Sequence, residues 1–237
     1  MENLDHTFKP RQNKKLYRNY IIMSSILCAT ILFIIEQILM VDYLTKTLSK
    51  IILFTISPLI LIKFIRKTSL KKGLNIQKTD IKTISTGIGL GLVAVGILIG
   101  TFMILKQSIN METISIEMAT KSKITEANYL IVATYFTLGN SFLEEFFFRG
   151  FVFINMFKMG YKKTAYIFSS ALFAIYHIGI FKNWFILELI VLCLIGLFLT
   201  GIIFDYVDTK SDNFLNSWTI HILADLTIAI IGYIYLF

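Results

Sequence analysis

The sequence predicts an all-α, polytopic integral membrane protein with about seven transmembrane helices (six to eight). Of its 237 residues 56% are hydrophobic, and the mean hydropathy is +0.71. Several apolar runs approach the roughly 20 residues that a helix needs to cross a bilayer. The runs are continuous rather than alternating, and the chain has only 2 prolines. Helices, which satisfy their own backbone polar groups in lipid, are therefore favoured over a β-barrel.

The first half of the chain predicts a basic tail and three spans. Residues 1–19 form the tail, which we expect in the cytoplasm, and the apolar run 20–41 follows. This run is too long for a signal peptide and lacks an A-x-A cleavage site, so we interpret it as a retained first span. A second span is expected at 48–65, where Pro58 could kink the helix. The third, at 84–105, contains five glycines, which indicate closely packed helix backbones.

The second half predicts four spans after a polar stretch at 106–127. The first of them is long enough to tilt, to break or to extend beyond the bilayer. A polar turn that contains Asp205 and Asp208 is expected before the last span. The four expected spans are the runs 129–157, 164–181, 184–204 and 214–237. Residues 20–237 are thus predicted to form a single transmembrane helical domain.

The distribution of positive charge predicts the orientation. With the N-terminus inside, the inner segments hold 16 Lys and Arg residues and the outer segments hold six, among them Lys46 and Lys50. This bias predicts a cytoplasmic N-terminus in the plasma membrane. It also accounts for the net charge of +8 without a nucleic acid partner, which we do not expect. Cys28 and Cys193 both lie in apolar runs, so neither a disulfide framework nor a thiolate metal site is predicted.

One apolar, aromatic segment carries two adjacent carboxylates and an arginine, Glu144, Glu145 and Arg149. Each charge inside a membrane costs about 2.5–3.5 kcal/mol. Glu145 and Arg149 are i,i+4 neighbours and can form a structural ion pair. Glu144 lies about 100° further round the helix, so the same contact does not neutralise it. The spacing therefore predicts one supporting pair beside one carboxylate that is available for chemistry.

Two histidines, His177 and His221, lie inside other predicted spans. Counted inward from flanking polar residues, Glu144 and His177 are 14 residues deep and His221 is nine residues deep. At about 1.5 Å per residue these depths are ~21, ~21 and ~14 Å. We therefore expect the three groups to meet near the middle of the membrane. His221 and Asp225 share one helix face, where a carboxylate can fix the tautomer of the ring.

Three motifs occur in order within residues 129–230. They are Glu144-Glu145-x-x-x-Arg149, Phe173-x-x-x-His177 and His221-x-x-x-Asp225. Together they resemble the CPBP family of intramembrane endopeptidases, which contains CAAX-processing and bacteriocin-processing (Abi) enzymes. The resemblance implies a protease-like core in which Glu144 activates water with the help of His177. His221 and Asp225 would bind the oxyanion or position the water, and Glu145 and Arg149 would support the motif helix.

Asp225 departs from the pattern, because many family members carry Asn at this position. An ionised Asp cannot donate a hydrogen bond to an oxyanion. Its role, catalytic or supportive, is therefore left open. The resemblance implies small membrane-associated peptides or protein tails as substrates, in peptide maturation, signalling or bacteriocin processing and immunity. The Lys, Ile and Asn usage suggests a bacterial source, and the oligomeric state cannot be read from the sequence.

Other chemistries stay open at this stage. No cofactor is expected, but Glu144, His177 and His221 could bind a divalent metal, since carboxylate and imidazole suit zinc. The sequence contains no H-E-x-x-H motif. Ser141 has a limited similarity to the serine of the rhomboid G-x-S-G motif, although Phe142 replaces the second glycine. One alternative is a non-catalytic membrane regulator or immunity protein that binds a peptide or a sensor kinase. Another is a proton-coupled transporter that passes protons along Glu144 and the histidines, but no inverted repeat in the sequence supports it.

Overall fold

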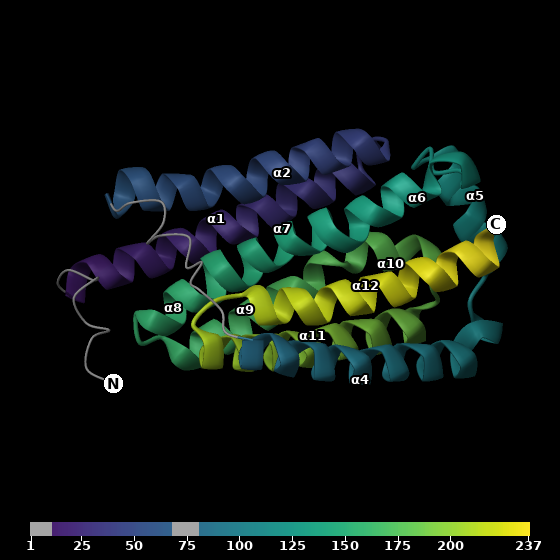
Figure 1. Ribbon diagram of the computed structural model, residues 1–237. Helices are drawn as coiled ribbons and strands as arrows, with labels where there is room; N and C mark the ends of the chain where they lie inside the picture. The colour runs from purple at the N-terminus through teal and green to yellow at the C-terminus, as the bar shows by residue number, and fades with distance from the viewer. Residues whose placement is uncertain (1–10, 68–80) are drawn as a thin grey trace.

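The fold is a bundle of helices that run along one common direction (Figure 1). The computed structural model describes residues 11–67 and 81–237, and all regular structure in these two ranges is helical. Six of the described helices are long and apolar enough to cross a membrane: Asn13–Gln37, Tyr43–Ile65, Ile84–Ser108, Lys162–Trp184, Leu187–Ser211 and Leu215–Leu236. The predicted all-α, polytopic membrane fold is thereby confirmed.

The run predicted as a span at 129–157 belongs to a composite helix through the middle of the bundle (Figure 1). Its α-helical parts alternate with π-helical turns, which are rare and often occur at functional sites. In chain order the parts are α6 (Glu126–Thr134), η3 (Tyr135–Asn140), α7 (Ser141–Glu145), η4 (Phe146–Phe153) and α8 (Ile154–Lys158). The composite helix is not one of these six candidate spans, and its α7 part carries the two adjacent glutamates.

The remaining helices surround the composite helix. They are α1 (Arg11–Gln37), α2 (Tyr43–Ile60) with η1 (Leu61–Ile65), α4 (Ile81–Leu105) with η2 (Lys106–Ser108), α5 (Met111–Thr120), α9 (Lys162–Tyr176), α10 (Ile178–Trp184), α11 (Leu187–Ser211) and α12 (Leu215–Leu236). Several predicted boundaries differ from the helix bounds: α1, for example, begins at Arg11, inside the predicted tail. Two further differences bear on the site. Helix α2 begins before residue 48, because Asp42 caps it and accepts a hydrogen bond from the Thr45 N–H. Helix α11 continues through Asp205 and Asp208, which the sequence had placed in a polar turn.

Aromatic side chains fix the helices around α7. Phe54 of α2 stacks on Phe147 of η4 with ring centroids 3.9 Å apart. Phe148 meets Phe173 of α9 edge to face at 5.4 Å. All four rings are buried, and aromatic pairs of this kind add about 0.5–1.5 kcal/mol to the burial of their area. The cluster therefore holds α2 and α9 against the glutamate-bearing helix.

The glycines of the third span explain the contact between α4 and α12 only in part. A methyl group on Gly87 would lie 3.3 Å from the carbonyl oxygen of Asn216, and one on Gly91 would collide with Leu223. The expectation of close packing is confirmed at these two positions. At Gly89, Gly96 and Gly100 a methyl group would meet no atom of the described residues within 4 Å, so close packing does not explain those glycines.

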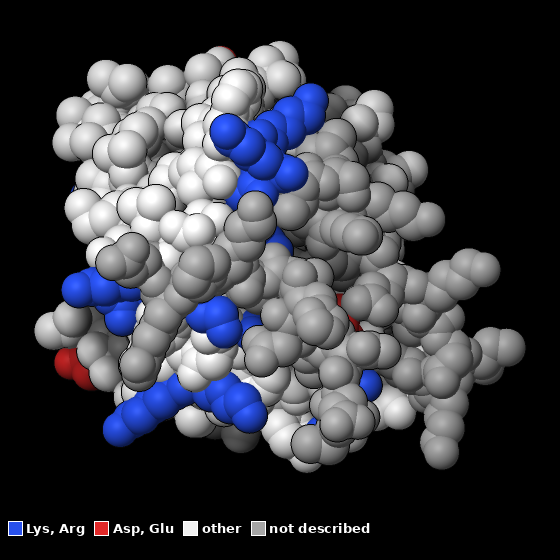
Figure 2. All heavy atoms as spheres, turned by 90° about the vertical axis from the view of Figure 1, so that its left-hand side faces the viewer, with Lys and Arg blue, Asp and Glu red and all other residues white. Residues whose placement is uncertain are grey.

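One end of the bundle is rich in basic side chains (Figure 2). This end is formed by the start of α1, the end of η1, the turn between α8 and α9, and the end of α11 (Figure 1). The described Lys and Arg residues of these segments are Lys14, Lys15, Arg18, Lys63, Arg66, Lys67, Lys158, Lys162, Lys163 and Lys210. Positive charge thus gathers at the end that the sequence predicts to be cytoplasmic.

Candidate active site

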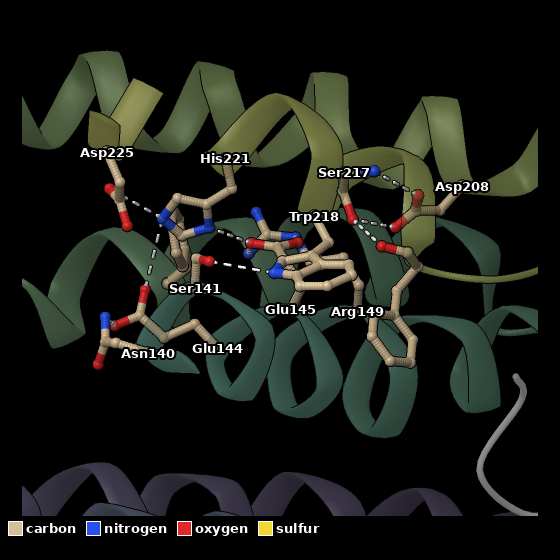
Figure 3. A network of polar contacts seen from close by, with 12 residues as sticks. Asn140, Ser141, Glu144, Glu145, Arg149, Asp208, Ser217, Trp218, His221 and Asp225 are labelled. Atoms are coloured by element: carbon tan, nitrogen blue, oxygen red, sulfur yellow. Dashed lines mark hydrogen bonds and ion pairs between the residues drawn. The ribbon is translucent and has the colours of Figure 1, made fainter. Parts of the chain in front are cut away.

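Glu144 is the centre of a buried polar cluster (Figure 3). Its side chain reaches helices α2, α9 and α12, and only 3% of the residue is exposed. The two carboxylate oxygens have different surroundings. Oε1 accepts hydrogen bonds from Lys50 Nζ at 2.5 Å and from Asn140 Nδ2 at 3.1 Å. Oε2 accepts no hydrogen bond from any described residue and faces the two imidazole rings.

His177 owes its orientation to the end of α9. Because the helix stops at Tyr176, the carbonyl of Phe173 is among the last four of the helix, which lack a helical N–H partner. Nδ1 of His177 lies 2.7 Å from this carbonyl oxygen, and only a protonated Nδ1 can donate there. Nε2 then faces Glu144 Oε2 at 3.8 Å. The ring of Phe173, four residues before His177 in the motif, lies beside the imidazole, with the two ring centroids 4.8 Å apart.

His221 approaches from α12 and contacts three carboxyl groups. Its Nδ1 lies 2.8 Å from Glu145 Oε1, and its Nε2 lies 3.8 Å from Glu144 Oε2 and 3.5 Å from Asp225 Oδ1. The predicted His221–Asp225 pair is therefore formed across one helical turn. The contact with Glu145 was not predicted, and it links the supporting pair directly to the site (Figure 3).

Glu145 and Arg149 form the predicted i,i+4 ion pair, with Arg149 Nε 3.3 Å from Glu145 Oε2. Both side chains are fully buried. A third member was missed, since Asp205 Oδ1 lies 3.6 Å from the same nitrogen. Asp205 also accepts hydrogen bonds of 3.2 Å from Ser169 and Ser170 of α9. The network thus ties the composite helix to both α9 and α11.

Two further residues were missed as parts of the buried network. Lys50, predicted near the outer membrane surface, is 4% exposed and paired with Glu144. Asp208 accepts hydrogen bonds from the Ser217 N–H at 3.2 Å and from its hydroxyl at 2.8 Å. It thereby satisfies a free N–H in the first turn of α12, the helix that carries His221.

Charge in this interior is unevenly divided. The described residues include five buried carboxyl groups, Glu144, Glu145, Asp205, Asp208 and Asp225, and two buried cations, Lys50 and Arg149. Uncompensated charge is expensive at such depth. The described interior thus holds three more buried carboxyl groups than buried cations, and the two site histidines lie among them.

The serine alternative gains little from this geometry. Ser141 donates to the carbonyl of Thr137 and accepts a 3.1 Å hydrogen bond from Trp218 Nε1. Its hydroxyl is thus held by a backbone carbonyl and an indole, with no hydrogen bond to either site histidine among those seen for the described residues. Across the described ranges, no group of three or more His, Cys, Asp and Glu side chains is arranged to hold a metal ion.

Comparison with known proteins points in the same direction as the geometry. Residues 126–227 match the family model described as type II CAAX prenyl endopeptidase Rce1-like. The matched region contains Glu144, His177, His221 and Asp225. No curated protein and no solved structure matches the chain.

Proposed function

Because residues 126–227 form an Rce1-like domain of the type II CAAX prenyl endopeptidase family, we propose that the chain is a glutamate-dependent intramembrane endopeptidase. One observation carries the proposal. Glu144 Oε2, the carboxylate oxygen without a hydrogen bond from a described residue, lies 3.8 Å from Nε2 of both His177 and His221. The carboxylate of Glu144 and the Nε2 atoms of His177 and His221 thus converge on one place in the interior of the helix bundle.

This arrangement is suited to the activation of water. A separation of 3.8 Å is too long for a direct hydrogen bond. It allows one water to bond to both Glu144 Oε2 and His177 Nε2. Glu144 takes a proton from this water as its oxygen attacks the peptide carbonyl carbon. When the C–N bond breaks, the same proton passes to the leaving amine, so Glu144 is regenerated.

His221 is placed to stabilise the oxyanion that forms during this attack. Its Nδ1 is held by Glu145 at 2.8 Å, so the ring is fixed with Nε2 toward the reaction centre. A fixed donor aimed at the developing charge is a large source of rate enhancement. Asp225, 3.5 Å from Nε2, is a positioning residue for this ring.

The substrates that fit such a site are small membrane-associated peptides or the tails of membrane-bound proteins. The candidate base is buried among apolar helices, which favours a substrate that is itself associated with the bilayer. In a bacterial plasma membrane with the basic end inside, such cleavage would serve peptide maturation, signalling or bacteriocin processing. The peptide bond that is cut depends on side chains outside the motifs.

The proposal is tested by peptide cleavage in detergent, read by mass spectrometry. Wild type and Glu144→Gln are compared on hydrophobic peptides, with and without a prenylated CAAX end. Glu36→Gln is the matched control, because Glu36 is also an ion-paired glutamate of a spanning helix but pairs with Lys46. Cleavage by wild type and Glu36→Gln, and its loss in Glu144→Gln, supports the proposal. Full cleavage by Glu144→Gln would refute the glutamate mechanism.

A chelator added to the same assay separates two uses of these side chains. Cleavage that persists in the chelator fits water activated by Glu144 without a metal ion. Cleavage that stops, and returns with added zinc, would make Glu144, His177 and His221 metal ligands. A different result would favour a non-catalytic regulator or immunity protein. In that case wild type cuts no peptide, and cells that carry Glu144→Gln in place of wild type behave like wild-type cells.

Ser141→Ala is expected to retain cleavage. The hydroxyl holds Trp218 and a backbone carbonyl, so its loss should cost about 1 kcal/mol of stability. Activity within about twofold of wild type is expected, since a hydroxyl held in this way makes no contact with the transition state. Loss of cleavage in a folded Ser141→Ala protein would instead indicate serine chemistry.

Asp225→Asn is expected to retain cleavage, whereas Asp225→Ala is expected to lose most of it. An Asn side chain can keep the present 3.5 Å contact with His221 Nε2, and its NH₂ group can also donate to an oxyanion. The measurement is kcat for both variants on the best peptide. Equal inactivity of the two would show that the carboxyl group itself takes part in the reaction.

A further inference from the structure

Lys50 lies outside the region that matches the family model, yet it touches the candidate base. It is on α2, in the first half of the chain, and 4% of it is exposed. Lys50 and Arg149 are the two buried basic side chains of the described residues. A buried ammonium group is costly unless it is paired, so its position requires an explanation.

The surroundings of Lys50 fix its ammonium group in one place. Nζ donates to Asn140 Oδ1 at 2.5 Å and to Glu144 Oε1 at 2.5 Å. The rings of Tyr176 and Phe54 lie beside it, with centroids 5.0 and 5.7 Å from Nζ, a distance at which aromatic faces attract cations. The ammonium group therefore has two hydrogen-bond acceptors and aromatic walls.

Asn140 completes a three-membered arrangement. Its oxygen accepts from Lys50, and its NH₂ group donates to Glu144 Oε1 at 3.1 Å. Both donors converge on the same carboxylate oxygen. The carboxylate is thereby held in one rotation, in which the second oxygen, Oε2, lies 3.8 Å from Nε2 of both His177 and His221. Figure 3 shows the contact with His221.

We propose that Lys50 is a positioning residue of the peptidase site, which holds Glu144 by Oε1 so that Oε2 is the oxygen that receives the proton of the attacking water. The inference rests on the proposed function. It means that the site needs Lys50 of α2 in addition to the residues of the three motifs. It also gives the two carboxylate oxygens of Glu144 different roles: Oε1 is held by Lys50, and Oε2 receives the proton.

The kinetic test uses Lys50→Met, which keeps the length of the side chain and removes its charge. Without Lys50 the carboxylate can rotate, and a misplacement of about 1 Å can cost about 10²-fold in rate. We expect kcat to fall by that order, with KM changed by less than about twofold, because the substrate contacts remain. Lys46→Met is the matched control: it removes an ion pair with Glu36 one turn away on the same helix and should leave kcat unchanged.

The second test does not depend on activity. Lys50→Met is introduced into wild type and into Glu144→Gln, and the Tm of each protein is measured in the same detergent. In wild type the change leaves a buried carboxylate without its cation, so Tm should fall by about 5 °C or more. In Glu144→Gln no charge is left unpaired, so the fall should be less than half as large.

The outcomes separate the two proposals. Equal falls in Tm in both backgrounds, or a kcat for Lys50→Met within about twofold of wild type, would overturn the role of Lys50. Absence of cleavage by wild type would remove the proposed function and any catalytic part for Lys50. The difference between the two Tm shifts would still show whether Lys50 and Glu144 interact.

Discussion

Glu144→Gln is expected to lower kcat by about 10²–10⁴-fold, the range that a general base contributes. An amide cannot take the proton of the attacking water, whereas its oxygen can still accept the hydrogen bond from Lys50.

The adjacent change, Glu145→Gln, should mainly affect stability. Glu145 is fully buried and contacts both Arg149 and His221, so its neutralisation should cost about 3 kcal/mol.

The roles of Glu144 and Glu145 are distinguished by comparing the Glu144→Gln and Glu145→Gln variants. Both variants change one carboxylate to an amide on the same short helix, and kcat and Tm are measured for each in one detergent. Glu145→Gln should also lower kcat, but less than Glu144→Gln, because only the orientation of His221 is weakened. An inactive Glu145→Gln of wild-type stability, beside an active Glu144→Gln, would exchange the roles assigned to the two glutamates.

The sequence was sufficient for the parts of the site that lie one helical turn apart or at similar depth. The Glu145–Arg149 and His221–Asp225 pairs follow from i,i+4 spacing, and both are formed. The meeting of Glu144, His177 and His221 follows from counting residues inward, and the structure brings them within 3.8 Å. Such arguments work because a helix has a fixed rise and a fixed period.

The residues that were missed belong to helices whose ends were misjudged. The apolar run of the second span starts at residue 48, so Lys50 was placed near its surface end. The capping residue Asp42 sets the true start of α2 at Tyr43 and places Lys50 more than a full turn deeper. Asp42 was a signal in the sequence, because Asp is a preferred N-cap. Asp205 gave no such signal, since only the packing of α11 against Arg149 shows that it is buried.

Arg149→Met is expected to destabilise the folded protein by about 3–5 kcal/mol, the range seen when one partner of a buried ion pair is removed. The guanidinium group is fully buried between Glu145 and Asp205, and the rings of Phe173 and Phe204 lie 4.1 and 5.0 Å from its central carbon. Without it, two carboxylates face each other in an apolar interior.

The measurement is Tm in detergent for wild type, Arg149→Met and the double variant Arg149→Met/Asp205→Asn. Removal of one of the two carboxylates should restore part of the lost Tm, because repulsion rather than lost packing causes most of the damage. A double variant no more stable than Arg149→Met would show that Arg149 acts through its stacking on the two rings, and that Asp205 is held by Ser169 and Ser170 alone.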